Sequence, residues 1–197
     1  MNHLEAALLE VVAFLEGRST PYMVVGGFAS LHWGRQRLTR DLDLTVEVPM
    51  SSLGNFVTDL GREFKLVERE PMGFAQQNHL IRLSTRVQVP VALMLALLPY
   101  EVAAIRRAVD VPVGPRAVRL CSPEDLIIFK LASERAQDHI DVEGVVLRQG
   151  EALDRPYLER HVRELAAGLE RQDVLDIYAA ALKRAELPPM DPRRGSA

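Results

Sequence analysis

The chain has 197 residues, of which 48% are hydrophobic, so it is long enough to bury one core or two close-packed lobes. A net charge of −3 excludes a global field that would draw the protein to nucleic acid, so any RNA contact must come from a local patch. The single cysteine excludes an internal disulfide, and the longest apolar run, residues 89–100, is too short to span a bilayer, so we expect a cytoplasmic protein.

The first two thirds of the chain reads as alternating helices and strands. Apolar residues recur at helical spacing over 3–17, and a short apolar strand over 22–25 precedes a glycine pair and a helix that ends at Trp33. A strand is expected from Asp41 to Val48. Farther along we expect helices over 52–61 and 99–109, a loop at 72–73, and strands over 64–67, 79–83, 86–95 and 118–120. Pro90 interrupts one of these strands and indicates a bulge or an edge position.

The last third reads as helical. Ser122 followed by Pro123 and two acidic residues is a strong helix start, and amphipathic helices are expected over 155–171 and 173–185. The sequence therefore predicts an α/β (α+β) fold. Its mixed-sheet core would cover residues 1–121 and its helical C-terminal lobe residues 122–187, with a disordered tail over 188–197.

The glycine pair Gly26-Gly27 lies between the strand over 22–25 and the helix that follows. Glycines at a strand-to-helix turn let backbone N–H groups approach a phosphate at the positive end of the helix dipole. This turn is therefore a candidate phosphate cradle.

Two carboxylates follow in the next strand, where polar and apolar residues alternate from Asp41 to Val48. Because side chains in a strand alternate between faces, Asp41 and Asp43 share one face about 7 Å apart. They repel each other unless a cation lies between them, and oxygen ligands suit a hard divalent ion such as Mg²⁺, or Mn²⁺ in its place. A phosphate cradle beside paired carboxylates predicts phosphoryl or nucleotidyl transfer.

Two basic features have alternative explanations. Arg37 belongs to a cationic loop over 34–40, which either offsets Asp41 and Asp43 or binds a triphosphate. Lys130 is one of three lysines and the only charge in the apolar stretch 126–132, so it either reaches the surface or faces an anion. Asp138 can form an ordinary surface pair with Arg135.

The residues form two ordered patterns, Gly26-Gly27-x-Ala29, His32-x-Gly34, Arg37-x-Thr39-x-Asp41-x-Asp43 and, later, Lys130-Leu131 with Asp138-x-x-Asp141. Together they resemble the polymerase-β-type nucleotidyltransferase superfamily, most closely its AbiEii and MenT-like toxin branch. The resemblance implies transfer of a nucleoside monophosphate from an NTP to RNA, at the tRNA 3′ end, by a toxin with a cognate antitoxin protein. It further implies metal binding by Asp41 and Asp43, catalysis by Asp138, and nucleotide contacts from Gly26, Gly27, Ser30, Arg37 and Lys130.

One position departs from the superfamily pattern. A third catalytic carboxylate is expected on a later strand, and Ala92 stands at that position. No Asp or Glu occurs between Glu70 and Glu101 to replace it. Three explanations are open: the branch works with Asp41, Asp43 and Asp138, the chain is a degenerate nucleotide binder, or the acid has been deliberately replaced.

Two other classes of function are compatible with these residues. One is an antitoxin or antibiotic-type nucleotidyltransferase that modifies a protein or a small molecule. The other is a non-catalytic nucleotide-binding protein, which the alanine at position 92 would suit.

Overall fold

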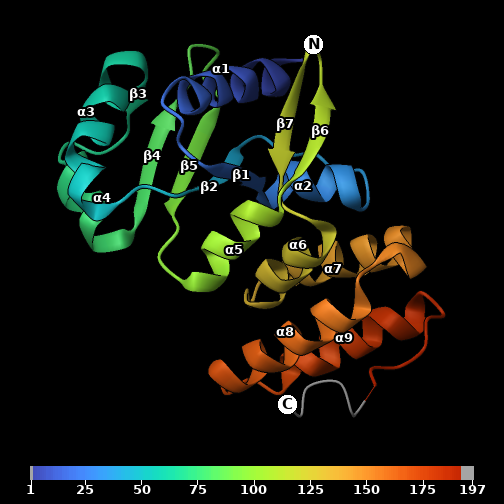
Figure 1. Ribbon diagram of the computed structural model, residues 1–197. Coiled ribbons are helices and arrows are strands. Elements are labelled where there is room, and N and C mark those ends of the chain that lie inside the picture. The colour runs from blue at the N-terminus through green and yellow to red at the C-terminus, as the bar shows by residue number, and fades with distance from the viewer. Residues whose placement is uncertain (1, 192–197) are drawn as a thin grey trace. The chain divides into compact units, whose positions relative to one another are not determined.

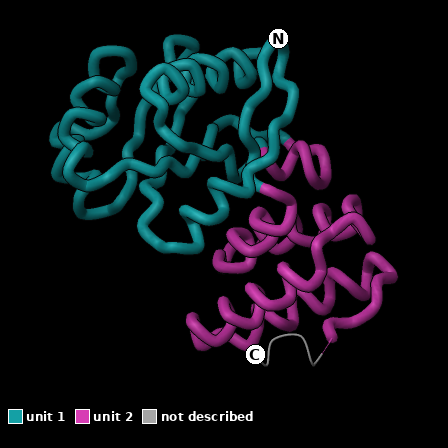
Figure 2. Tube along the Cα trace, in the orientation of Figure 1, with its two compact units in different colours: residues 1–28, 38–121 teal, residues 29–37, 122–197 magenta. Residues whose placement is uncertain are grey.

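The computed structural model describes residues 2–191, and the chain divides into two compact units (Figures 1 and 2). Unit 1 comprises Met1–Phe28 and Leu38–Cys121, and unit 2 comprises Ala29–Arg37 and Ser122–Ala197. Unit 2 thus includes a segment, residues 29–37, that the sequence-based division assigned to the N-terminal core. The boundary falls inside helix α2 (Gly26–Trp33).

Unit 1 is built on a mixed sheet, which within residues 2–191 has seven strands in the order β3-β4-β5-β2-β1-β7-β6. Two neighbouring pairs, β2 with β5 and β1 with β7, are parallel, and the others are antiparallel. This sheet confirms the predicted α+β class. The strands are β1 (Tyr22–Val25), β2 (Leu42–Val46), β3 (Lys65–Leu66), β4 (Leu80–Ser84), β5 (Pro90–Leu95), β6 (Val109–Val113) and β7 (Arg116–Leu120).

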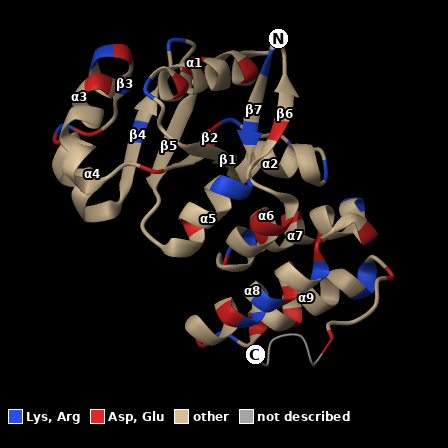
Figure 3. Cartoon of the chain, viewed as in Figure 1, with Lys and Arg blue, Asp and Glu red and all other residues tan. Residues whose placement is uncertain are grey.

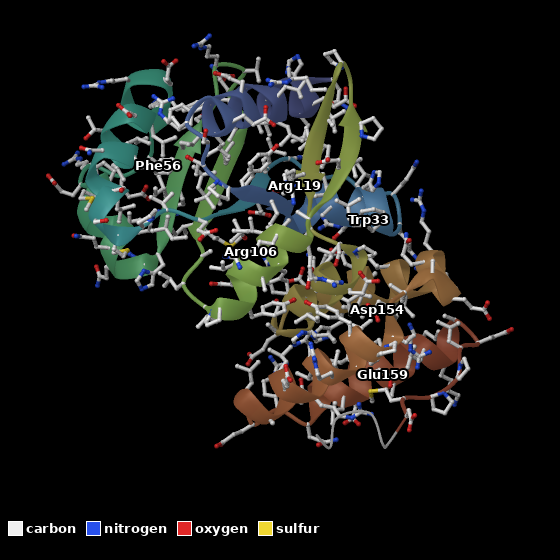
Figure 4. All side chains as sticks on the ribbon, viewed as in Figure 1. Trp33, Phe56, Arg106, Arg119, Asp154 and Glu159 are labelled. Atoms are coloured by element: carbon white, nitrogen blue, oxygen red, sulfur yellow. The ribbon has the colours of Figure 1, made fainter. Side chains whose placement is uncertain are left out.

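The core of unit 1 follows the alternation of its strands. On β5, Val91, Leu93 and Leu95 are buried, whereas Ala92 and Met94 on the opposite face are partly exposed. Helices α1 (His3–Gly17), α3 (Leu53–Glu63), α4 (Pro71–Asn78) and α5 (Pro99–Arg107) complete the unit, together with the 3₁₀ turn Met50–Ser52. Aromatic packing joins α1 to α3, because the ring of Phe14 lies 6.0 Å from that of Phe56, which Figure 4 labels.

Two expectations for unit 1 are wrong. Residues 72–73 lie inside α4, a helix that begins with a proline at its first position and buries only Ala75, so its periodic signal is weak. Pro90 does not mark an edge strand or a bulge. It is the first residue of β5, which lies between β4 and β2, and a first-residue proline is tolerated even in a central strand.

Unit 2 contains helices α6 (Pro123–Leu131), α7 (Ala136–Gln149), α8 (Arg155–Gly168) and α9 (Asp173–Arg184), with a 3₁₀ turn at Gly150–Ala152. The expected N-cap of α6 is present, since the Ser122 hydroxyl accepts a hydrogen bond of 3.1 Å from the Asp125 N–H. Residues of both charge signs lie along α8 and α9 (Figure 3), as expected for solvated helices.

The start of the predicted disordered tail contacts α8. Arg155 donates to the Pro188 carbonyl at 3.0 Å, and the buried Glu159, labelled in Figure 4, accepts from the Asp191 N–H at 3.1 Å. The rest of that tail, residues 192–197, lies outside the described residues. Among residues 2–191, no helix has both the length and the apolar character needed to cross a bilayer.

Candidate active site

Strand β1 ends at Val25 and helix α2 begins at Gly26, so the chain passes from strand to helix at this glycine. Gly26 has a φ of +62°, and a Cβ at this position would lie 2.1 Å from Oδ2 of Asp43. Both features require glycine. The Asp43 carboxylate therefore lies directly against the backbone at the N-terminal end of α2, which is the positive end of the helix dipole. Gly27 is the next residue of the helix.

Asp41 lies just outside the strand that carries Asp43. The expected strand from Asp41 begins at Leu42 in the structure, and Asp41 is exposed. The Thr39 hydroxyl donates to Oδ1 of Asp41 at 3.1 Å, so a neighbouring side chain orients this carboxylate. Asp41 and Asp43 are thus one loop residue and one strand residue, two positions apart in sequence.

Ala92 lies directly beside Asp43. The parallel strands β2 and β5 pair Asp43 with Ala92, and the antiparallel strands β4 and β5 pair Ala92 with Arg82. Paired residues project from the same face of a sheet, so these three side chains form one row. The Arg82 Nε donates to Oε1 of Glu68 at 2.7 Å. An acid at position 92 would stand between Asp43 and a guanidinium group.

The donors of unit 1 suit Mg²⁺ when a substrate supplies further ligands. Mg²⁺ is commonly held by one or two carboxylates together with phosphate oxygens and water. Asp43 and Asp41 provide two carboxylates, and the alanine at position 92 adds none. The part of the chain that the structure describes contains no group of three or more His, Cys, Asp or Glu residues that could hold a metal ion.

In unit 2, Lys130 is buried between two carboxylates. Its ammonium group contacts Oδ1 of Asp138 and lies 3.0 Å from Oδ2 of Asp141, and its side chain is only 8% exposed. Lys130 therefore faces anions and does not extend to the surface. Asp138 also accepts from Nε of Arg135 at 2.8 Å, and it is buried, unlike a carboxylate in an ordinary surface pair.

Asp141 gathers polar groups from several segments. Nε and Nη2 of Arg37 each donate to one of its carboxylate oxygens at 3.0 Å, a two-point contact. The Ser30 hydroxyl donates to Oδ2 at 3.1 Å, and the Gln137 amide donates to Oδ1 at 3.1 Å. Ser30 was expected to contact phosphate, and in this structure its hydroxyl contacts Asp141.

The environment of these two acids changes their acidity. Burial alone would raise the pKa of Asp138, but hydrogen bonds from Lys130 and Ser133 and the nearby positive charges lower it overall. Burial likewise opposes ionisation of Asp141, and the hydrogen bonds from Lys130 and Arg37 outweigh it, so its pKa is also lowered. Both groups are therefore carboxylates at neutral pH.

The segment 29–37 is held to helix α7. A Cβ at Gly34 would lie 3.1 Å from the Val145 backbone N, so the two segments approach too closely for a larger residue to fit without a shift. Nη1 of Arg148 donates to the Gly34 carbonyl at 2.9 Å, and the Gln149 amide donates to the Trp33 carbonyl at 2.7 Å. These contacts explain why the segment belongs to unit 2.

The expected site residues thus form two groups, each within one unit: Gly26, Gly27, Asp41, Asp43 and Ala92 in unit 1, and Ser30, Arg37, Lys130 and Asp138 in unit 2. Asp141 belongs to the later sequence pattern but was assigned no role, although it contacts Ser30, Arg37 and Lys130. Its position three residues after Asp138 on one helix face was the available signal.

A strand, a glycine turn, a helix and a second strand with a carboxylate against that turn form the arrangement expected from the resemblance to polymerase-β-type nucleotidyltransferases. The chain belongs to the family described as "Nucleotidyl transferase of unknown function (DUF2204)", whose model matches residues 4–175. It is therefore an enzyme of the nucleotidyltransferase class. This assignment replaces the alternative of a non-catalytic binding protein. Comparison with curated proteins finds no match.

Solved structures show the same fold at low sequence identity. An antigenic nucleotidyltransferase-like protein from Paracoccidioides brasiliensis is 15% identical with a TM-score of 0.52, and the match covers 92% of each chain. The structure of ANT(2″)-Ia in complex with adenylyl-2″-tobramycin is 18% identical with a TM-score of 0.50, covering 93% of this chain and 99% of the other. The lincosamide antibiotic adenylyltransferase LnuA, bound to lincomycin, is 16% identical with a TM-score of 0.50, covering 72% and 95%.

Proposed function

We propose that the protein transfers a nucleoside monophosphate from an NTP to an acceptor hydroxyl with the aid of a divalent cation. The observation that carries this proposal is the Asp43 carboxylate packed against Gly26 at the N-terminus of α2, with Asp41 two residues earlier. In the reaction, the acceptor oxygen forms a bond to the α-phosphorus and the bond from that phosphorus to the β-phosphate oxygen breaks. Pyrophosphate leaves.

The residues of the chain have separate roles in this scheme. Asp41 and Asp43 would hold Mg²⁺ or Mn²⁺, which neutralises charge on the phosphate oxygens when bound. Gly26 and Gly27 present backbone N–H groups to phosphate. Asp138, a carboxylate at neutral pH, is the candidate that accepts the proton of the acceptor hydroxyl.

Cationic side chains would neutralise the β- and γ-phosphates, which leave as pyrophosphate. Arg37 and Lys130 are the candidates, since both lie at the Asp141 carboxylate. The Ser30 hydroxyl belongs to the same cluster. Charge stabilisation by fixed cations is the main contribution a protein makes to transfer of a phosphoryl-type group.

RNA is the first candidate acceptor, at the tRNA 3′ end. The resemblance to the AbiEii and MenT-like branch supports it, and the toxin role with a cognate antitoxin protein follows from the same resemblance. A local basic surface would be required, because the net charge of the chain is −3. The loop over 34–40 contains Arg35, Arg37 and Arg40 and is the candidate for it.

A small hydroxylated molecule is the second candidate acceptor. The observation that favours it is the fold match over nearly the full length of an enzyme bound to adenylyl-2″-tobramycin. A small acceptor does not require a basic RNA-binding surface, which agrees with the net charge of −3. A protein acceptor, as for an antitoxin that modifies its partner, is a third outcome of the same test.

The acceptor can be identified by incubating the protein with α-labelled NTPs and Mg²⁺ in separate reactions with total RNA, with protein extract and with aminoglycosides or lincosamides. We expect label on RNA. Label on an antibiotic or on a protein would replace the RNA proposal by the corresponding alternative. Absence of both label transfer and pyrophosphate release in every reaction would contradict the proposed function.

A further inference from the structure

Asp141 connects parts of unit 2 that are far apart in sequence. Ser30 and Arg37 lie 111 and 104 residues before it, and Lys130 comes from the preceding helix α6. Each contributes a donor within 3.1 Å of the same carboxylate, whose side chain is only 5% exposed. One acidic group thus sets the relative positions of a hydroxyl, a guanidinium and an ammonium group.

The two carboxylates of this cluster, Asp138 and Asp141, attract cations from several segments. Lys130 lies between both acids, Arg37 pairs with Asp141, and Arg135 pairs with Asp138. The Arg37 side chain is 29% exposed, so the guanidinium can meet a ligand from solvent while two of its nitrogens face Asp141. A guanidinium held in this way is preorganised for phosphate oxygens.

We propose that Asp141 is a positioning residue that holds Arg37 and Lys130 together as one binding site for the polyphosphate of an NTP. Asp141 does not contact the phosphates itself, because two anions repel each other. It acts through the cations, since it fixes the plane of the Arg37 guanidinium and keeps Lys130 beside it. The inference rests on the proposed function and specifies which residues receive the triphosphate.

A purely structural role for Asp141 predicts a different result. In that case the carboxylate would only hold residues 29–37 on α7, and its loss would lower the free energy of unfolding without changing the affinity of the folded protein for polyphosphate. Stability and affinity must therefore be measured on the same variants.

The test compares Asp141→Asn with Glu143→Gln, a matched carboxylate-to-amide change on the same helix at a residue that pairs with Arg184. Inorganic tripolyphosphate is titrated calorimetrically into each full-length protein, at a temperature where urea unfolding shows that it is folded. We expect Asp141→Asn to raise the Kd at least tenfold and Glu143→Gln to leave it unchanged. We also expect the KM for NTP to rise more than kcat falls, and Asp141→Glu to recover much of the affinity. A Kd for Asp141→Asn within twofold of the wild-type value overturns the inference.

A second variant covers the case in which Asp141→Asn does not fold. The substitution Arg37→Lys changes a partly exposed side chain and keeps its positive charge, but a lysine cannot make the two-point contact with Asp141. We expect it to weaken tripolyphosphate binding roughly fivefold, and an unchanged Kd would overturn the inference. If the wild-type protein transfers nucleotide but these variants bind as it does, only the inference fails. If the wild-type protein neither transfers nucleotide nor binds tripolyphosphate, the proposed function fails with it.

Discussion

The substitution Gly26→Ala tests the central geometry of unit 1. Alanine at a φ of +62° costs roughly 1–2 kcal/mol of backbone strain. Its Cβ would lie 2.1 Å from Oδ2 of Asp43, whereas ordinary contact begins at 3.4 Å, so the carboxylate must recede by the difference, 1.3 Å. A misplacement of about 1 Å at a reacting centre lowers a rate roughly 100-fold.

We therefore expect Gly26→Ala to unfold at lower urea concentration and to release pyrophosphate about 100-fold more slowly than the wild-type protein. The matched control is Gly54→Ala in α3, where an added Cβ has no neighbour within 4 Å. The control should retain full activity and lose no stability, because the added Cβ meets no neighbour and alanine is a good helix former. If Gly26→Ala released pyrophosphate at the wild-type rate, this would refute the argument that the position of the Asp43 carboxylate depends on the absence of a Cβ at residue 26.

Three further predictions use other residues. Ala92→Asp should raise Mg²⁺ affinity in a calorimetric titration, because the new carboxylate would stand beside Asp43 on the same sheet face, and unchanged affinity would refute a missing-ligand explanation. Lys130→Ala should cost up to about 3–5 kcal/mol in urea unfolding and weaken NTP binding, because it removes the buried cation that lies between two buried carboxylates. Lys183→Ala at an exposed position should change neither, and equal effects of the two substitutions would contradict the role of Lys130. Because the pKa values of Asp138 and Asp141 are lowered in the folded protein, these carboxylates stabilise the fold above their ordinary pKa of about 4, and this stabilisation is lost as the pH falls through the folded-state pKa values. Urea unfolding from pH 7 to pH 3 should show the loss as a falling free energy of unfolding. An equally steep fall in the Asp141→Asn variant would contradict this prediction.

The segment of unit 1 from Tyr22 to Val46 is largely predictable from sequence because its signals are local. The strand Tyr22–Val25 and the glycine turn follow from short-range patterns, and the structure places Asp43 on a strand as the alternation predicts. The alternation also predicts the buried face of β5, which leaves Ala92 on the opposite face.

The features that could not be predicted from the sequence depend on contacts between residues that are far apart in the chain. No local pattern indicates that Ser30 and Arg37 contact Asp141 more than 100 residues later, so the sequence grouped Ser30 with the glycine turn. Helix α4 escaped prediction because a single buried residue gives no periodicity. Pro90 was misread because its place in the sheet depends on the neighbouring strands β4 and β2.

The most direct test of nucleotidyl transfer at Asp43 compares Asp43→Asn with Asp59→Asn, a matched change at a partly exposed acid on α3 that pairs with Arg18 and Arg62. Pyrophosphate release from NTPs is measured with Mg²⁺, in the presence of the acceptor that takes up label. We expect the wild-type protein and Asp59→Asn to release pyrophosphate at the same rate and Asp43→Asn to release none above background. Equal rates from Asp43→Asn and the wild-type protein would contradict the assignment of this carboxylate to the active site.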